Sequence, residues 1–200
     1  MLPVSVAAVV VTGRAGPAKQ GRPMSLIKCF DASGEIPSST PDGCEACLGY
    51  IGGAAAHVWT LPEWKRFGHL IQFPIWVADF SGDPATQGTD AAKAATKLGW
   101  RGARAIVLDM ETVNDPKFLS AWAAEIRKAK FTPAWYGSRV YSAQAAGYLR
   151  WLADPDGIAS LQPGFDAVQY SWNVKVPGGV VDLSVVDSKF AAKGGRGPRR

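Results

Sequence analysis

The stretch Ala105–Glu111, with the sequence AIVLDME, decides both the expected fold and the expected chemistry. Its apolar first half predicts a buried strand, and Asp109 and Glu111 stand at the carboxyl end of that strand. Because side chains alternate along a strand, the two carboxyl groups should point to one face, a single pleat apart. A purely structural role is the alternative, in which the two acids cap the following turn or pair with Arg104 or Lys117.

Short apolar strands and helical segments alternate on both sides of this stretch. Further strands are expected at residues 25–31, 47–53, 73–80, 132–137, 150–154, 166–172 and 179–186. Helices are expected at residues 61–70, where Thr60 and Glu63 fit a capping box, at 90–98, at 118–130 after Asp115-Pro116, and in short form at 143–148. The last three strands leave room for turns but not for full helices between them.

This order predicts an α/β fold, a TIM-type barrel of five βα units followed by three strands. Eight strands are the number that closes a barrel around packed side chains. An open doubly wound sheet is the alternative, but such a sheet would not normally finish on three strands without crossover helices.

The composition is that of one soluble globular domain, with 200 residues of which 47% are hydrophobic and 20% charged. The net charge of +5 comes from the two ends, since residues 1–25 and 191–200 contain seven bases and no acid. Removing these from the 22 bases leaves 15 against 17 acids, so we expect no nucleic-acid partner.

The domain organisation follows from these ends. We expect a disordered lead over residues 1–25, the barrel over 26–190, and a basic disordered tail over 191–200. The lead could also be a poor signal peptide or lie upstream of a true start at Met24. Its apolar run, Leu2–Val11, is too short for a membrane span.

The three cysteines do not predict a metal centre. Cys44 and Cys47 form a lone Cys-x-x-Cys that leads into a strand, whereas a redox pair would open a helix. Zinc needs four ligands, and neither a second cysteine pair nor a nearby histidine pair supplies them. We expect no metal and no cofactor, and at most a local disulfide.

Two further carboxylates are expected beside Asp109 and Glu111. Asp31 ends the first strand, and Asp182 lies within the eighth, which must neighbour the first in a closed barrel. Barrels of this type place their active sites at the carboxyl ends of the strands. Crowded carboxylates raise one another's pKa, which suits a general acid beside an ionised partner, the arrangement that glycoside hydrolysis requires.

Aromatic residues lie on or beside most of the expected strands, and about half of them should simply pack the core. Tyr136, Tyr170 and Trp172 lie nearest the strand ends, so these three are the predicted substrate-binding aromatics. A sugar ring would stack its C–H face on such a side chain, and the neighbouring Gln169 would bond sugar hydroxyls.

The order and spacing of these motifs resemble glycoside hydrolase family 25, the lysozyme-like muramidases, and more closely an actinobacterial and phage-associated relative, a glycoside hydrolase-like domain of unknown function. The matching residues, spread over 26–190, are Asp31-Ala32-Ser33, Asp109-Met110-Glu111, Tyr136-Gly137, Trp151-Leu152-Ala153, Gln169-Tyr170 and Val181-Asp182-Leu183. Residues 34–47 lack the aromatic-rich turn of true muramidases, and the glycine runs at 49–53 and 99–102 fit the uncharacterised relative better.

The resemblance implies the same barrel, with peptidoglycan glycan as substrate. It also implies that Glu111 is the general acid, that Asp109 positions or stabilises, and that Asp31 and Asp182 complete an anionic cleft.

Two classes of function follow. The first is an enzyme that hydrolyses cell-wall glycan by carboxylate acid/base catalysis. The second is a catalytically weak barrel that binds glycan or serves as a phage or cell-surface structural module. The four carboxylates favour the enzyme, while the lack of a wall-binding repeat or a convincing export signal favours the second, or a phage lysin released by lysis. In either case we expect a monomer without a membrane span. Two locations stay open: outside the cell at the wall, or inside a phage-infected cell until lysis releases the protein.

Overall fold

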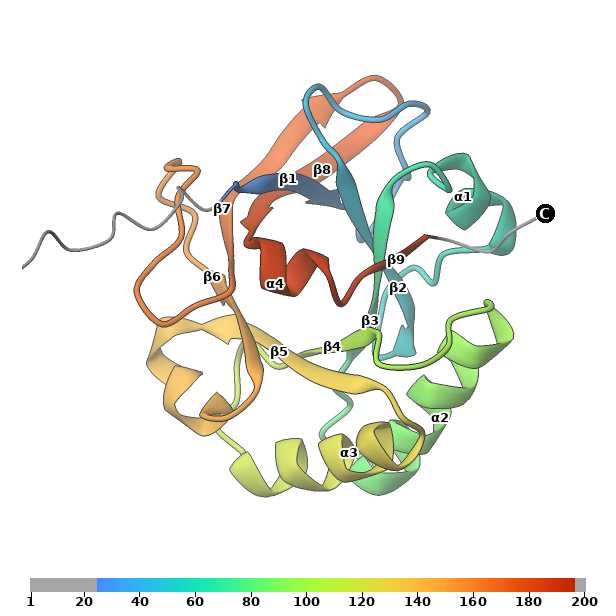
Figure 1. Cartoon of the computed structure of the whole chain (residues 1–200), viewed down its shortest axis with the longest axis vertical. Coiled ribbons are helices and arrows are strands. Elements are labelled where there is room, and N and C mark those ends of the chain that lie inside the picture. Colours follow the sequence, from blue (N-terminus) through green and yellow to red (C-terminus); the bar gives the residue numbers. More distant parts are fainter. Residues whose placement is uncertain (1–24, 197–200) are drawn as a thin grey trace, which may run out of the picture.

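Eight strands close a barrel in the computed structural model, which describes residues 25–196 (Figure 1). The strands are β1 (Ile27–Asp31), β2 (Ala46–Gly53), β3 (Ile71–Val77), β4 (Ala105–Asp109), β5 (Thr132–Ser138), β6 (Leu149–Ala153), β7 (Ala167–Val176) and β8 (Gly179–Val186). Each pairs with the next along the chain, and β8 pairs with β1, so the sheet closes. The predicted α/β barrel is confirmed, although residues 32–45 connect β1 to β2 without a helix.

The direction of β8 decides which of its residues lie at the candidate site. Strands β1 to β7 are parallel, whereas β8 runs antiparallel to both of its neighbours. β8 follows β7 through a tight turn at Pro177-Gly178, where Gly178 has a φ of 81° that favours glycine. The first half of β8 therefore lies at the end of the barrel where the parallel strands finish, and we call that end the mouth.

The helices lie outside the barrel (Figure 1). They are α1 (Leu61–Arg66), α2 (Pro84–Lys97), α3 (Pro116–Lys128) and a 3₁₀ helix, η1 (Arg139–Ala145). The predicted capping box of Thr60 and Glu63 is confirmed at the start of α1. The predicted start of α2 at residue 90 is wrong by six residues, because the Asp83 side chain accepts a hydrogen bond from the Thr86 backbone N–H and caps a helix that begins at Pro84.

Two apolar layers hold these elements together. Inside the barrel, alternate side chains such as Leu48, Phe73 and Trp151 fill the lumen. Outside, the opposite strand faces pack against the helices through residues such as Trp122 and Trp135, both fully buried. This two-sided burial explains why the strands are short runs of apolar residues.

The base of the barrel, opposite the mouth, is closed by the end of the chain. Helix α4 (Ser188–Ala191) and strand β9 (Gly195–Arg196) cross this end, where Phe190 packs against Phe73 with ring centroids 5.1 Å apart (Figure 1). The Ala105 backbone N–H donates to Lys193 O at 2.7 Å. The prediction of a disordered tail from residue 191 is therefore wrong for 191–196, which lack periodicity but still complete the core. Residues 1–24 and 197–200 lie outside the described residues.

Cys29, Cys44 and Cys47 are buried free thiols, so the local disulfide allowed by the sequence is not formed. Burial raises the pKa of the Cys44 thiol to about 11. Within residues 25–196 no group of three or more His, Cys, Asp or Glu side chains is arranged to hold a metal ion. No helix in that range is both long and apolar enough to span a membrane.

Candidate active site

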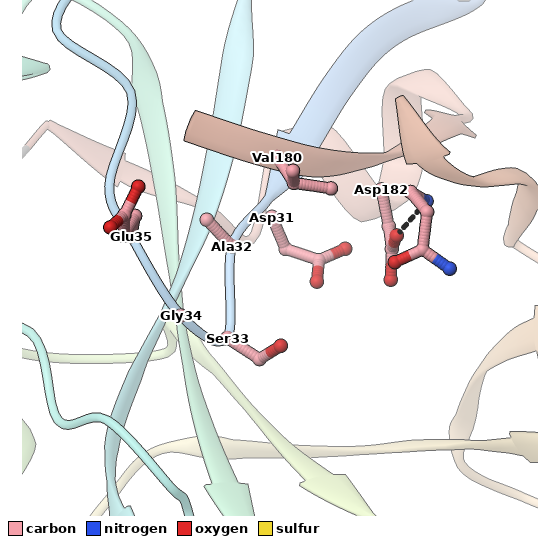
Figure 2. A pocket seen from close by; sticks show the side chains of 8 residues that line it. Asp31, Ala32, Ser33, Gly34, Glu35, Val180 and Asp182 are labelled. Carbon is pink, nitrogen blue, oxygen red and sulfur yellow. Dashed lines mark hydrogen bonds between the residues drawn. The ribbon is translucent and has the colours of Figure 1, made fainter. Parts of the chain in front are cut away.

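Asp31 and Asp182 lie side by side at the mouth. They are direct cross-strand partners in the antiparallel pairing of β1 and β8, so their side chains lie on the same face (Figure 2). Asp31 is only 2% exposed, whereas Asp182 is partly exposed. The antiparallel direction of β8 is what places a residue near the start of this strand level with the end of β1.

Asp109 and Glu111 approach the mouth from β4. Asp109 is the last residue of the strand, and the predicted extension of β4 to residue 111 is wrong by two residues. The Met110 backbone N–H donates to Tyr136 O at 2.9 Å, and the buried Met110 side chain joins the outer core. Glu111 follows as an exposed residue at the rim. Neither acid makes an ion pair with Arg104 or Lys117 in the described part of the chain.

The protonation of these four acids follows their burial. Loss of hydration raises the pKa of Asp31 well above its usual range, and the charge of Asp182 raises it further. Burial, and then the charge of Glu111, likewise raise the pKa of Asp109 strongly. Although Glu111 as a residue is exposed, partial loss of hydration of its carboxyl group raises its pKa; Tyr136 opposes this rise and the charge of Asp182 adds to it.

Burial also raises the pKa of Asp182, against the hydrogen bond from the Asn173 backbone N–H. The sequence predicted a general acid at Glu111 beside an ionised partner. In the structure Asp109 is more deeply buried than Glu111 and has the more strongly raised pKa.

Gln169 connects the acids to two of the predicted aromatic residues. Its Oε1 accepts hydrogen bonds from Tyr136 Oη at 2.6 Å and from Trp172 Nε1 at 2.5 Å. Its Nε2 donates to Asp31 Oδ2 at 3.3 Å and to Asp182 Oδ2 at 3.2 Å. Tyr136, Gln169 and Trp172 are thus brought together beside the carboxylates, and Trp172 keeps 47% of its surface exposed.

Tyr170 does not join them. Its side chain is buried on the outer face of the barrel with Leu152, Val168 and Val185. The prediction that Tyr170 lines the site is wrong, because strand alternation that turns Gln169 into the lumen turns its neighbour outward.

Two residues of the site were missed from the sequence. Tyr50, near the end of β2, donates its hydroxyl to Asp31 Oδ1 at 3.3 Å, and its place near a strand end was the signal that could have indicated it. The Asn173 backbone N–H donates to Asp182 Oδ1 at 2.8 Å from an irregular part of β7, where Asn173 has a φ of 55°. No feature of the local sequence pattern predicts this bulge in β7.

A pocket of about 350 Å³ opens beside Asp31 and Asp182 (Figure 2). Its lining is Asp31, Ala32, Ser33, Gly34, Glu35, Asn173, Val180 and Asp182. Asp109 and Glu111 are not part of the lining, so the pocket occupies one side of the mouth. Three carboxylates and a serine hydroxyl give it the polar character that a hydroxyl-rich ligand requires.

Replacing Asp31 by Asn is expected to stabilise the protein at neutral pH. Because the folded-state pKa of Asp31 is raised, ionising this carboxyl costs stability as the pH rises from the unfolded-state pKa through the folded-state pKa. The variant should melt a few degrees higher than wild type at pH 7, at about 2–4 °C per kcal/mol, and the difference should shrink toward pH 4. Thermal melts at both pH values measure this.

The exposed Asp42→Asn serves as the control and should leave the melting temperature nearly unchanged. A lower melting temperature for Asp31→Asn at pH 7 would contradict the assignment of Asp31 as a destabilising buried acid.

Comparisons with known proteins find the fold but no close relative. No protein-family model and no curated protein sequence matches the chain. Among solved structures, an uncharacterized protein of B. stearothermophilus superposes with a TM-score of 0.69 at 16% identity, over 84% of this chain and 100% of that one. The CTP1L endolysin gives 0.61 at 18% identity, over 82% and 67%.

A family 25 glycosyl hydrolase from Bacillus anthracis gives a TM-score of 0.58 at 15% identity, over 80% of this chain and 88% of that one. At such identities the likeness concerns the fold alone. This chain therefore shares the closed α/β barrel fold of the endolysin and the family 25 hydrolase.

Proposed function

We propose that the protein hydrolyses the glycan of cell-wall peptidoglycan, with Glu111 as the general acid. The observation that carries the proposal is the convergence of Asp31, Asp109, Glu111 and Asp182 at the mouth of a barrel, each with a raised pKa. The fold shared with an endolysin and a family 25 hydrolase supports the substrate class.

In the proposed reaction, protonated Glu111 gives its proton to the glycosidic oxygen of the leaving sugar as the C–O bond breaks. Glu111 suits this role because it stands at the rim, within reach of a polymer lying across the mouth. The ionised member of the neighbouring acids stabilises the oxocarbenium-like centre that develops at the sugar carbon. A water molecule then adds its oxygen to that carbon and returns a proton to Glu111. The exposed indole of Trp172 offers a surface for a sugar ring.

A glycan-binding barrel without catalysis is the second candidate. The exposure of Glu111 favours it, because a general acid in contact with water gains little from the low dielectric of a closed site. Under this alternative, Asp31, Asp182 and Trp172 would bind the sugar and no bond would be cleaved.

Assays on purified actinobacterial cell walls distinguish the two candidate functions. We expect the wild-type protein to clear a wall suspension and to release new reducing ends without new free amino groups, since a glycosidic bond rather than a peptide bond is cleaved. Co-sedimentation with the same walls measures binding independently. Co-sedimentation without any release of reducing ends would rule out the hydrolase and support the glycan-binding barrel. The appearance of free amino groups would mean that a peptide bond, not a glycosidic bond, is cleaved.

A further inference from the structure

Gln169 lies beside the four acids, and its hydrogen-bonding capacity is completely used by the protein. A primary amide has two N–H donors and two acceptor lone pairs. In this structure the donors face Asp31 and Asp182, and the acceptor oxygen receives Tyr136 and Trp172. No group of Gln169 is left for a sugar hydroxyl, so the expectation that it binds substrate directly does not fit its surroundings.

The orientation of this amide is determined by Trp172. An indole N–H is only a donor, so the atom that it meets must be the amide oxygen and not the nitrogen. The Tyr136 hydroxyl meets the same oxygen at 2.6 Å. Once the oxygen faces the two aromatic residues, the amide nitrogen can only face the aspartates. Gln169 is also 2% exposed, which keeps water from replacing any of these partners.

The two ends of this connection have different environments. Asp31 is 2% exposed, whereas Trp172, which lies on β7 beside the Asp31–Asp182 pair, keeps 47% of its surface exposed. We propose that Gln169 is a positioning residue that ties the indole of Trp172 to the Asp31–Asp182 pair, so that the surface that receives a sugar and the carboxylates beside it are held in one arrangement. The part concerning sugar rests on the proposed function, whereas the connection itself does not.

The hydrogen bonds from Gln169 Nε2 should affect the ionisation of Asp31 and Asp182. An N–H donor favours the charged form of a carboxyl group, so losing Gln169 Nε2 should move the titration of the pair to higher pH. The other groups that face the pair are Tyr50 from β2, Asp109 from β4, Glu111 from the loop after β4, Tyr136 from β5, and the Asn173 backbone N–H from β7. Apart from Tyr136, which loses Gln169 Oε1 as its acceptor, these groups keep their partners when Gln169 is replaced.

Carboxyl ¹³C NMR of aspartate-labelled protein tests this directly. Asp31 and Asp182 are assigned from Asp31→Asn and Asp182→Asn, and their titrations are followed in wild type, Gln169→Leu and Gln169→Glu. We expect both variants to titrate at higher pH than wild type, Gln169→Glu more so because it adds a carboxyl in place of a donor. Two variants are used so that failure of one to fold leaves the other to decide.

Gln87→Leu is the matched control. Gln87 Oε1 also accepts from a tryptophan, Trp76 Nε1, at 3.2 Å, and its Nε2 donates to Asp79 O at 2.6 Å, but it contacts no member of the acid pair. Its loss removes a comparable set of hydrogen bonds and should leave the Asp31 and Asp182 titrations where they are in wild type. Equal titrations in wild type and a folded Gln169 variant would overturn the proposal.

The indole end is measured separately. The Trp172 Nε1–H resonance, identified by its absence in Trp172→Phe, should exchange with solvent about tenfold faster in Gln169→Leu than in wild type, which is the worth of one hydrogen bond. Unchanged exchange would mean that Gln169 does not hold the indole, and the proposal would fail at this end.

Activity on cell walls adds a third measurement. We expect Gln169→Leu to lower kcat about tenfold to a hundredfold with little change in KM. The variant loses the hydrogen bonds to the Asp31 and Asp182 carboxyl groups, whereas the Trp172 indole that receives the sugar remains. Trp172→Phe keeps a ring and should lose less. If wild type cleaves no wall, the proposed function fails, and the two NMR measurements still decide the role of Gln169.

Discussion

Replacing Glu111 by Gln is expected to lower the hydrolysis of cell-wall glycan at least ~100-fold, the usual scale of general acid catalysis. The amide keeps the shape and polarity of the side chain but has no proton to transfer to the leaving oxygen. The initial rate of reducing-end release from purified walls measures the loss. Binding to the same walls should change little, because the amide would still present hydrogen-bonding groups at the rim.

The pH dependence adds a second check on Glu111. Its pKa is raised by partial burial and by Asp182, so the protonated form persists to a higher pH than for a free glutamate. Wild-type activity should therefore be highest on the acidic side and fall as Glu111 ionises. Glu45→Gln is the matched control, since Glu45 is exposed and precedes β2 at the base of the barrel. A Glu111→Gln protein as active as Glu45→Gln would end the assignment.

Phe190→Ala is expected to lower the free energy of unfolding by about 3–5 kcal/mol, the cost of removing a large buried aromatic side chain. Phe190 is 0% exposed and lies in the lumen cluster against Phe73, so no neighbour can close the cavity without moving the base of the barrel. Denaturant titration measures the change, and the melting temperature should drop by about 2–4 °C per kcal/mol.

Val140→Ala is the control for this experiment. Val140 is 83% exposed, so its truncation should change the free energy of unfolding by less than about 0.5 kcal/mol. A Phe190→Ala protein as stable as Val140→Ala would mean that the packing of α4 does not stabilise the barrel.

The sequence alone determined the class of the fold and the position of the acids along it. Apolar runs of strand length, separated by helices with caps that can be read from the sequence, leave few arrangements other than an eight-stranded barrel. The acids at 31 and 109 follow such runs, so their place at the carboxyl end of a parallel sheet could be predicted. These features depend on local patterns, which a single sequence displays.

The tertiary structure decided what depends on contacts between distant segments. The antiparallel direction of β8 makes Asp182 the partner of Asp31, and a bulge in β7 brings the Asn173 N–H to Asp182. Likewise, residues 191–196 have no periodicity of their own, and their place is given by contacts with β3 and Ala105. Pairing, bulges and burial are properties of two segments at once, and no pattern along one segment records them.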